Sequence, residues 1–456
     1  MRYTVKLESI RLENIKNVEG GYIKFRNKKR NGGDCDIIGI YGQNGSGKTA
    51  VIDCMEIIQE LFMGRGLVRR FFDCLYVNAE RSSVTVEFSV SVNEKKYFVS
   101  YEAVLKFIEN NTDFSVAKES LKCFGMDGDK YRASVVCDFE EENIFLPKRL
   151  FDTLTGGDKK LKTNLYAQKV LSKEHKMSFI FNPSVMELLK KSGGANELLA
   201  VISALGQYAS MDLFVIKNSH SGIISLNELI PFSFKIEDGG TRIVKGEAGI
   251  RLDQPTLFPM VGYKDVSVLI GQLNVVIKCL VPNLQIEVKE YGEQVDDSGA
   301  PCMRFELLAC SAGTKLPLRN ESEGIKKIIS ILSVLISFYN GENTTVLIDE
   351  FDAGIFEYLL GELLSVLRDN ARGQLIFTSH NLRPIEVLDR ENIYFSSCNP
   401  KKRYIRLTNV KSNGNLRDFY YRTIELGGQE EKLFDETNLS ELSLALRIAG
   451  NGGARR

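Results

Sequence analysis

The stretch Asp36-Ile-Ile-Gly-Ile-Tyr-Gly-Gln-Asn-Gly-Ser-Gly-Lys-Thr49 decides the fold of this chain. An apolar strand (36–41) runs into a glycine-rich loop (42–49). The residues after the loop have the spacing of a buried helix face, with Val51, Met55, Ile58 and Phe62. A strand, a glycine-rich loop and a helix in this order predict a P-loop.

A P-loop holds a phosphate chain by turning backbone N–H groups inward, and glycines permit the conformations that this needs. Lys48 is predicted to reach the β- and γ-phosphates, and the Thr49 hydroxyl to ligate Mg²⁺. The following helix directs the positive end of its dipole at the anion. The predicted ligands are therefore ATP and Mg²⁺. The residues expected to contact them from this loop are Gly42, Asn44, Gly45, Ser46, Gly47, Lys48 and Thr49.

The composition describes a chain that can bury a substantial core. Of 456 residues, 43% are hydrophobic and 26% are charged, which predicts two domains or one domain with a large insertion. The formal net charge is zero. This excludes the global electrostatic footprint of a nucleic-acid binder but leaves room for a local basic patch, such as the loop at 28–33.

The cysteines and the apolar pattern indicate the compartment. The nine cysteines include no C-x-x-C pair, which predicts reduced thiols rather than disulfides or a zinc site. The first residues alternate like a strand instead of forming a leader, and there is no run of about 18 apolar residues. We expect a cytoplasmic protein without membrane contact.

Before and after the P-loop the pattern is that of strands. Residues 3–26 alternate, with a turn expected at Gly20-Gly21, and 83–105 read as a hairpin that turns at Asn93-Glu94. From about 140 to 215 the pattern is helical and locally basic. We therefore expect an α/β fold with an antiparallel β lobe, divided into an N-terminal part of the nucleotide-binding head (1–137), an inserted, mainly helical domain (138–263) and a C-terminal part (264–456).

Two further buried strands end in chemically reactive groups. Residues 344–348 precede Asp349 and Glu350, and 374–379 precede His380. Open α/β sheets bind their ligands at the carboxyl ends of the strands. Asp349 fits the Walker B carboxylate that holds Mg²⁺, and Glu350 is placed to act as general base on the attacking water.

His380 has two interpretations. A lone histidine is ordinarily a hydrogen-bonded core residue, but this one ends a predicted strand about 30 residues after Walker B. We therefore favour a contact with the γ-phosphate, and we assign His380 to the catalytic group with Glu350.

These motifs, in this order, resemble the ABC-type ATPase heads, a group that includes SMC proteins. The segments 317–327, 347–359, 415–420 and 426–429 are similar to the overcoming-lysogenisation-defect-like bacterial ATPases, which include the PARIS ATPase subunit AriA and abortive-infection ATPases. The resemblance covers nearly all of the chain and is weakest in the insertion. It implies ATP hydrolysis, a homodimer or a larger homo-oligomer, and a role in phage defence.

Within that resemblance, Ser322-Glu-Gly324 is the signature loop at the start of a helix expected at 325–339. It has Glu323 where the usual Leu-Ser-Gly-Gly-Gln pattern has its first glycine. The resemblance implies that Ser322 and Gly324 act on the nucleotide held by the partner subunit. Ser192-Gly-Gly194 looks more like a signature, but it lies far upstream of Walker B, so we interpret it as a turn between helices.

Two assignments stay open at the level of sequence. Asp352 fits either the D-loop carboxylate at a dimer seam or the N-cap of a helix. No glutamine before the β lobe stands out as a Q-loop residue, and Asn78 and Glu80 are candidates that the sequence does not separate.

Two function hypotheses follow. The first is an ATP-driven sensor or scaffold, a toxin–antitoxin-like regulator that answers a phage-derived trigger protein and controls a separately encoded effector such as a Toprim-like or other nuclease. The second is a self-sufficient DNA-processing or repair ATPase of the SMC or overcoming-lysogenisation-defect type. A Toprim nuclease needs an Asp-x-Asp motif, and the residues after His380 contain none. We therefore favour the regulator, and nucleic-acid contact remains without support.

Overall fold

The structure is a computed structural model. It describes residues 2–26, 36–76, 78–108, 112–126, 128, 130–142, 147–191, 197–238, 242–311, 313–408 and 415–450.

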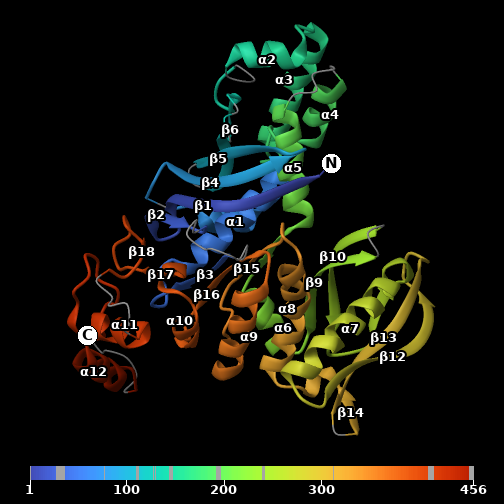
Figure 1. Cartoon of the computed structure of the whole chain (residues 1–456), viewed down its shortest axis with the longest axis vertical. Coiled ribbons are helices and arrows are strands. Elements are labelled where there is room, and N and C mark those ends of the chain that lie inside the picture. Colours follow the sequence, from blue (N-terminus) through green and yellow to red (C-terminus); the bar gives the residue numbers. More distant parts are fainter. Residues whose placement is uncertain are drawn as a thin grey trace.

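A six-stranded, mostly parallel sheet forms the centre of the molecule (Figure 1). Its strand order is β18-β17-β3-β16-β15-β8, and only the edge strand β18 is antiparallel to its neighbour. The bounds are β3 (Asp36–Tyr41), β8 (Leu213–Ile216), β15 (Thr345–Ile348), β16 (Gln374–Ser379), β17 (Ile393–Ser396) and β18 (Tyr404–Ile405). The strands that carry the P-loop, Walker B and His380 are therefore adjacent, and their carboxyl ends share one edge.

An antiparallel sheet lies over one side of this centre, in the order β2-β1-β4-β5-β6-β7. Its strands are β1 (Tyr3–Ile15), β2 (Val18–Lys24), β4 (Arg81–Val92), β5 (Lys95–Ile108), β6 (Asp113–Gly125) and β7 (Arg132–Asp138), with the short 3-10 helix η1 (Arg69–Cys74) beside β6. Helix α1 (Lys48–Phe62) packs into the same core as this sheet, because Val51, Met55, Ile58 and Phe62 are buried as predicted. The predicted α/β fold with an antiparallel lobe is confirmed.

Helices on the other side complete the nucleotide-binding head. These are α8 (Glu323–Asn340), α9 (Glu357–Asn370), α10 (Arg383–Val387) and α11 (Leu416–Leu426), which share a second core with β3, β15 and β16. The 3-10 helix η3 (Arg390–Asn392) leads into β17, and α12 (Leu439–Gly450) lies at the end of the described chain.

A third core lies beside α8 (Figure 1). It joins α7 (Met260–Leu280) to the strands β9 (Leu229–Asp238), β10 (Arg242–Arg251), β11 (Thr256–Pro259), β12 (Leu284–Val295), β13 (Pro301–Ser311) and β14 (Thr314–Pro317), with η2 (Leu318–Asn320) and α6 (Ser219–Ser225) at its margin. Among the described helices, α7 has the length and composition of a membrane span. A single helix of this kind is weak evidence for a membrane span, and Leu269 and Leu273 of α7 are fully buried in the third core.

The segment 138–263, which we expected to be an inserted, mainly helical domain, contains both helices and strands. It does contain the helices α2 (Lys148–Thr155), α3 (Lys159–Glu174), α4 (Pro183–Lys191) and α5 (Glu197–Met211), and α2 to α4 project from one end of the molecule (Figure 1). The same segment also supplies β8 to the central sheet and the β9–β10 hairpin to the third core. The four residues of β8 are too short to be recognised as a buried strand without their partner β15.

One turn lies elsewhere than the sequence suggested. The chain turns at Lys16-Asn17, between β1 and β2, and Lys16 has a φ of 51°. Gly20 and Gly21 instead lie within β2. A Cβ atom at Gly20 would be 2.5 Å from the carbonyl oxygen of Lys401, so these glycines permit a close approach of β2 to the β17–β18 loop rather than a turn. The hairpin turn at Asn93-Glu94 is confirmed, with φ values of 48° and 71°.

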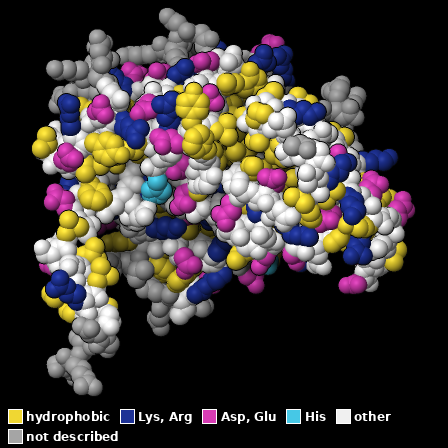
Figure 2. Space-filling view, turned by 90° about the horizontal axis from the view of Figure 1, so that it is seen from below, with side chains coloured by type: hydrophobic (Ala, Val, Ile, Leu, Met, Phe, Trp, Pro, Cys, Tyr) yellow, Lys and Arg dark blue, Asp and Glu magenta, His cyan; other side chains and the backbone are white. Residues whose placement is uncertain are grey.

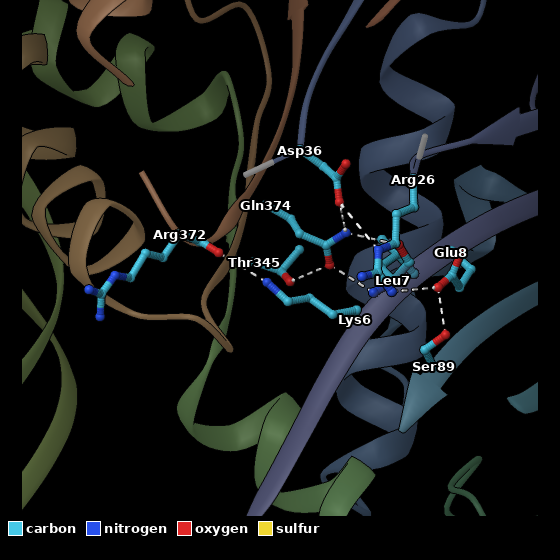
Figure 3. Close-up of polar contacts among 9 residues, drawn as sticks. All are labelled: Lys6, Leu7, Glu8, Arg26, Asp36, Ser89, Thr345, Arg372 and Gln374. Atoms are coloured by element: carbon cyan, nitrogen blue, oxygen red, sulfur yellow. Dashed lines mark hydrogen bonds and ion pairs between the residues drawn. The ribbon is translucent and has the colours of Figure 1, made fainter. Parts of the chain in front are cut away.

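The two sheets are joined by the side chain of Gln374, which is fully buried (Figure 3). Its Oε1 accepts a hydrogen bond from the backbone N–H of Leu7 at 2.7 Å, and its Nε2 donates to the carbonyl oxygen of Leu7 at 2.9 Å. The pairing of β1 with β4 shifts register just after Leu7. The amide therefore satisfies backbone groups of β1 from the central sheet, and Lys6 adds a bond to the carbonyl of Arg372 at 3.0 Å.

We expect Gln374→Met to lower the free energy of unfolding by ~2–4 kcal/mol, since it leaves the N–H and the C=O of Leu7 buried without these partners. The measurement is chemical denaturation followed by circular dichroism. Gln285→Met, at an exposed position of β12, is the control and should change little. Equal stability of the two variants would show that the amide contributes nothing net.

The cysteines within the described ranges are free thiols, and Cys35 lies outside those ranges.

Candidate ATP-hydrolysis site

The loop after β3 has the backbone that the P-loop prediction requires. Gly42, Gly45 and Gly47 have φ values of 149°, 73° and 86°. A Cβ at Gly42 would be 1.8 Å from the Oγ of Ser396, and one at Gly47 would be 2.7 Å from a methyl group of Val18. Both positions therefore need glycine for conformation and for space.

The remaining loop residues divide into two groups. Asn44 and Gly45 are exposed at the tip of the loop, whereas Ser46 is buried and shares a hydrogen bond with the Ser396 hydroxyl. The side chain of Asn17, in the β1–β2 turn, donates to the carbonyl of Gly45. The β lobe therefore braces the loop from one side, a contact that the sequence did not predict.

Lys48 lies folded over its own loop. Its Nζ donates to the carbonyl oxygens of Gly42 at 2.9 Å and Gln43 at 3.0 Å. Burial lowers the pKa of Lys48, while the nearby carboxylates of Asp349, Glu350 and Asp352 act in the opposite direction. The ammonium group is thus held where an anion in the loop would meet it.

The structure brings Thr49 and Asp349 together across the sheet. The Thr49 hydroxyl donates to Oδ1 of Asp349 at 3.2 Å, and the Thr378 hydroxyl donates to the same oxygen at 2.6 Å. Among the described residues, no group of three or more His, Cys, Asp or Glu side chains gathers around a common point. One hydroxyl and one carboxylate nevertheless fit Mg²⁺, which usually takes one or two protein ligands and completes its shell with phosphate oxygens and water.

Glu350 is held in an unusual conformation. Its φ is 49°, a value that non-glycine residues seldom adopt and that surrounding contacts must hold in place. Its N–H donates to the Thr378 hydroxyl at 2.7 Å, and its carbonyl accepts from Nζ of Lys327 at 2.5 Å. Sequence reasoning missed Thr378 and Lys327, because their roles depend on contacts between separate segments.

His380 and Asp352 meet at the end of β16. The carboxylate of Asp352 accepts from the backbone N–H of His380 at 3.2 Å and from that of Asn381 at 2.9 Å. Helix α9 has Phe356 as its N-cap, so Asp352 does not cap that helix and instead fixes the loop that carries His380. The imidazole is exposed and lines a cavity of about 370 Å³ together with Gly42 and with Arg417 of α11.

Ser322 is the N-cap of α8, the helix that was expected after the signature loop. Its Oγ accepts from the N–H of Ile325 at 3.3 Å, and the side chain is exposed. A Cβ at Gly324 would be 2.0 Å from the carbonyl of Gly354, so the first turn of α8 lies directly on the loop after Walker B. Asn78 and Glu80 are exposed before β4, and Ser192-Gly-Gly194 lies outside the described residues.

A buried ionic network lies behind the P-loop helix. Asp53, which is 2% exposed, accepts from Lys16 and from Lys217 at 2.7 Å, and Lys217 also bonds Glu56 at 3.0 Å. It ties α1 to the β1–β2 turn and to the residue after β8. Spacing gave no sign of this network, because its members are distant in sequence.

Two family models match the chain. One, described as an AAA domain, matches residues 9–207. The other, described as an AAA domain, putative AbiEii toxin, Type IV TA system, matches residues 225–384 and includes Walker B. The chain is an ATPase. No curated protein matches this ATPase significantly.

The ATPase is also similar to solved structures, at low identity. An Smc head domain from Pyrococcus furiosus, with an extended coiled coil and bound to the C-terminal domain of ScpA, is 14% identical over 93% of this chain and 100% of that chain, with a TM-score of 0.41. The SMC head domain from Thermotoga maritima is 14% identical over 88% and 99%, with a TM-score of 0.37. The recombination mediator protein RecF with ATP is 12% identical over 89% and 100%, with a TM-score of 0.36.

Proposed function

We propose that the chain is the Mg²⁺-dependent ATPase subunit of a bacterial anti-phage system of the abortive-infection type. ATP drives the heads to dimerise or to form a larger assembly, and that state controls a separately encoded toxic effector such as a nuclease. The observation that carries this proposal is the match of residues 225–384 to the AAA domain named after the AbiEii toxin, because this segment bears Ser322, the Walker B carboxylates and His380.

The proposed chemistry assigns one role to each group in the site. Lys48 and the loop amides bind the phosphates of ATP, and Thr49 and Asp349 hold Mg²⁺, which neutralises charge on the phosphate oxygens. Glu350 takes a proton from the attacking water. His380 lies beside Gly42 at the cavity, where it can contact the γ-phosphate.

Dimerisation is proposed because the signature serine and its surroundings are exposed. Ser322 faces solvent, and Phe356 and Tyr358, which follow the Walker B loop, are 72% and 56% exposed. Figure 2 shows hydrophobic side chains gathered in patches on the face seen from below. Exposed apolar side chains beside a catalytic loop support a contact between subunits.

Mixing two inactive variants tests the shared site. Lys48→Ala lacks a working P-loop, and Ser322→Arg lacks a working signature. An equal mixture should recover about one quarter of the wild-type ATPase rate, because about half of the dimers are mixed and each of those has one complete site out of two. Ser298→Arg, in the exposed β12–β13 turn, is the control and should remain active alone. Mixed oligomers without recovered activity would contradict a shared site.

The effector is expected to contact the helical projection or the C-terminal tail. None of the residues of α12 is buried, and its exposed apolar side chains are Leu439, Leu442, Leu444, Leu446 and Ile448. Co-expression with the neighbouring gene, pull-down and phage challenge, each with and without Lys48→Ala, test the regulatory role. Full phage protection by this chain alone, or nuclease activity that persists through stringent re-purification, would favour the self-sufficient DNA-processing enzyme instead.

A further inference from the structure

A buried lysine of the signature helix reaches the Walker B loop. Lys327 lies in α8 and is 5% exposed, and its Nζ donates to the carbonyl oxygen of Glu350 at 2.5 Å. Burial lowers the pKa of Lys327 to about 8. The charges of the Asp349, Glu350 and Asp352 carboxylates act in the opposite direction, to raise the pKa of its ammonium group.

Lys327 and Thr378 hold the two backbone polar groups of Glu350. The N–H of Glu350 bonds the Thr378 hydroxyl at 2.7 Å, and the carbonyl of the same residue bonds Lys327. Because Glu350 has a φ of 49°, its backbone conformation is disfavoured and needs contacts on both sides to persist. The direction of its side chain depends on that conformation.

The same helix touches the Walker B loop at a second point. Gly324 packs against the carbonyl of Gly354 so closely that a Cβ there would be 2.0 Å away. Ser322, at the N-cap of α8, is therefore connected to Glu350 through one rigid element. A displacement of the signature end of α8 would move the amino group that holds Glu350.

We propose that Lys327 is a positioning residue that sets the orientation of Glu350 and makes it depend on the position of the signature helix. The inference rests on the proposed function, in which Glu350 is the base and Ser322 engages a partner subunit. Lys327 is buried, and its bond is to the backbone of Glu350. It acts on the rate of hydrolysis through the backbone of Glu350, and a partner bound at Ser322 would act on the base through Lys327.

The neighbouring residue Lys326 provides a matched control. It lies in the same helix and is 2% exposed, and burial lowers its pKa as well. Its Nζ donates to Asn227 at 2.5 Å and to the carbonyl of Arg319 at 3.4 Å, away from Walker B. The two lysines therefore share residue type, helix and burial but differ in what they hold.

The test compares Lys327→Met with Lys326→Met in the full chain. We expect Lys327→Met to lower kcat by ~100-fold while the Kd for ATP stays within about threefold, because a misplaced catalytic group affects the chemical step and not ground-state binding. Lys326→Met should keep kcat within about threefold of wild type. Lys327→Gln serves as a second variant, with the same expected split, if Lys327→Met does not fold.

A double-mutant cycle with Glu350→Gln then separates positioning from an independent effect. If Lys327 acts through Glu350, Lys327→Met should lower the residual rate of Glu350→Gln by less than about threefold. A full ~100-fold loss in that background, or an unchanged kcat in Lys327→Met, would overturn the inference while leaving the proposed function intact. Loss of hydrolysis in wild type and in Lys326→Met alike would overturn both.

Discussion

Lys48→Ala is expected to abolish ATP hydrolysis and to weaken ATP binding by about 10²- to 10⁴-fold, since two charge-assisted contacts of ~1.5–3 kcal/mol each are lost. The Nζ of Lys48 now rests on the carbonyl oxygens of Gly42 and Gln43, so the ammonium group lies in the loop that the phosphates would enter. No other predicted change removes binding and catalysis together.

Calorimetry with ATP and Mg²⁺ measures the binding, and phosphate release measures the rate. Lys401→Ala is the control, because Lys401 is an exposed lysine of the β17–β18 loop next to β2 and should leave both quantities unchanged. Tight ATP binding by Lys48→Ala would refute the assignment of this loop. The melting temperatures of both variants show whether each is folded at the temperature of the assay.

Glu350→Gln is expected to separate binding from hydrolysis. Glutamine keeps the size of the side chain and leaves Thr49 and Asp349 in place, but it cannot accept the proton of the attacking water. The rate should fall by ~10²- to 10⁴-fold, the usual contribution of a general base. The Kd for ATP should stay within about threefold of wild type, because the loop that binds the phosphates is unchanged.

Single-turnover kinetics and ATP titration measure these two quantities. Glu342→Gln is a matched control, since Glu342 is an exposed carboxylate that precedes β15, at the opposite end of that strand from Glu350. Its removal should not change the rate. Glu350→Gln should also accumulate as a dimer with ATP in size-exclusion chromatography, because hydrolysis no longer separates the ATP-bound dimer. Hydrolysis by Glu350→Gln at the wild-type rate would assign the base elsewhere.

The site shows where prediction from sequence succeeded. The strand before the P-loop was predicted to the residue, the helix after it was predicted without exact bounds, and β15 and β16 were placed with their reactive groups at the carboxyl ends. Each of these elements is a continuous run of residues whose own spacing and glycine content dictate its conformation. The helix after Ser322 was expected from the resemblance to ABC-type ATPase heads, and the structure has Ser322 as its N-cap.

What the sequence by itself determined is therefore local: a phosphate-binding loop, two buried strands and the helices around them. Only the tertiary structure decided which distant groups meet. It brought Thr378 to both Asp349 and Glu350, placed Lys327 against Glu350, joined the two sheets through Gln374 and moved the expected turn from Gly20-Gly21 to Lys16-Asn17. The physical reason is that a backbone conformation depends on neighbouring residues, whereas a buried hydrogen bond depends on which segments the folded core brings together.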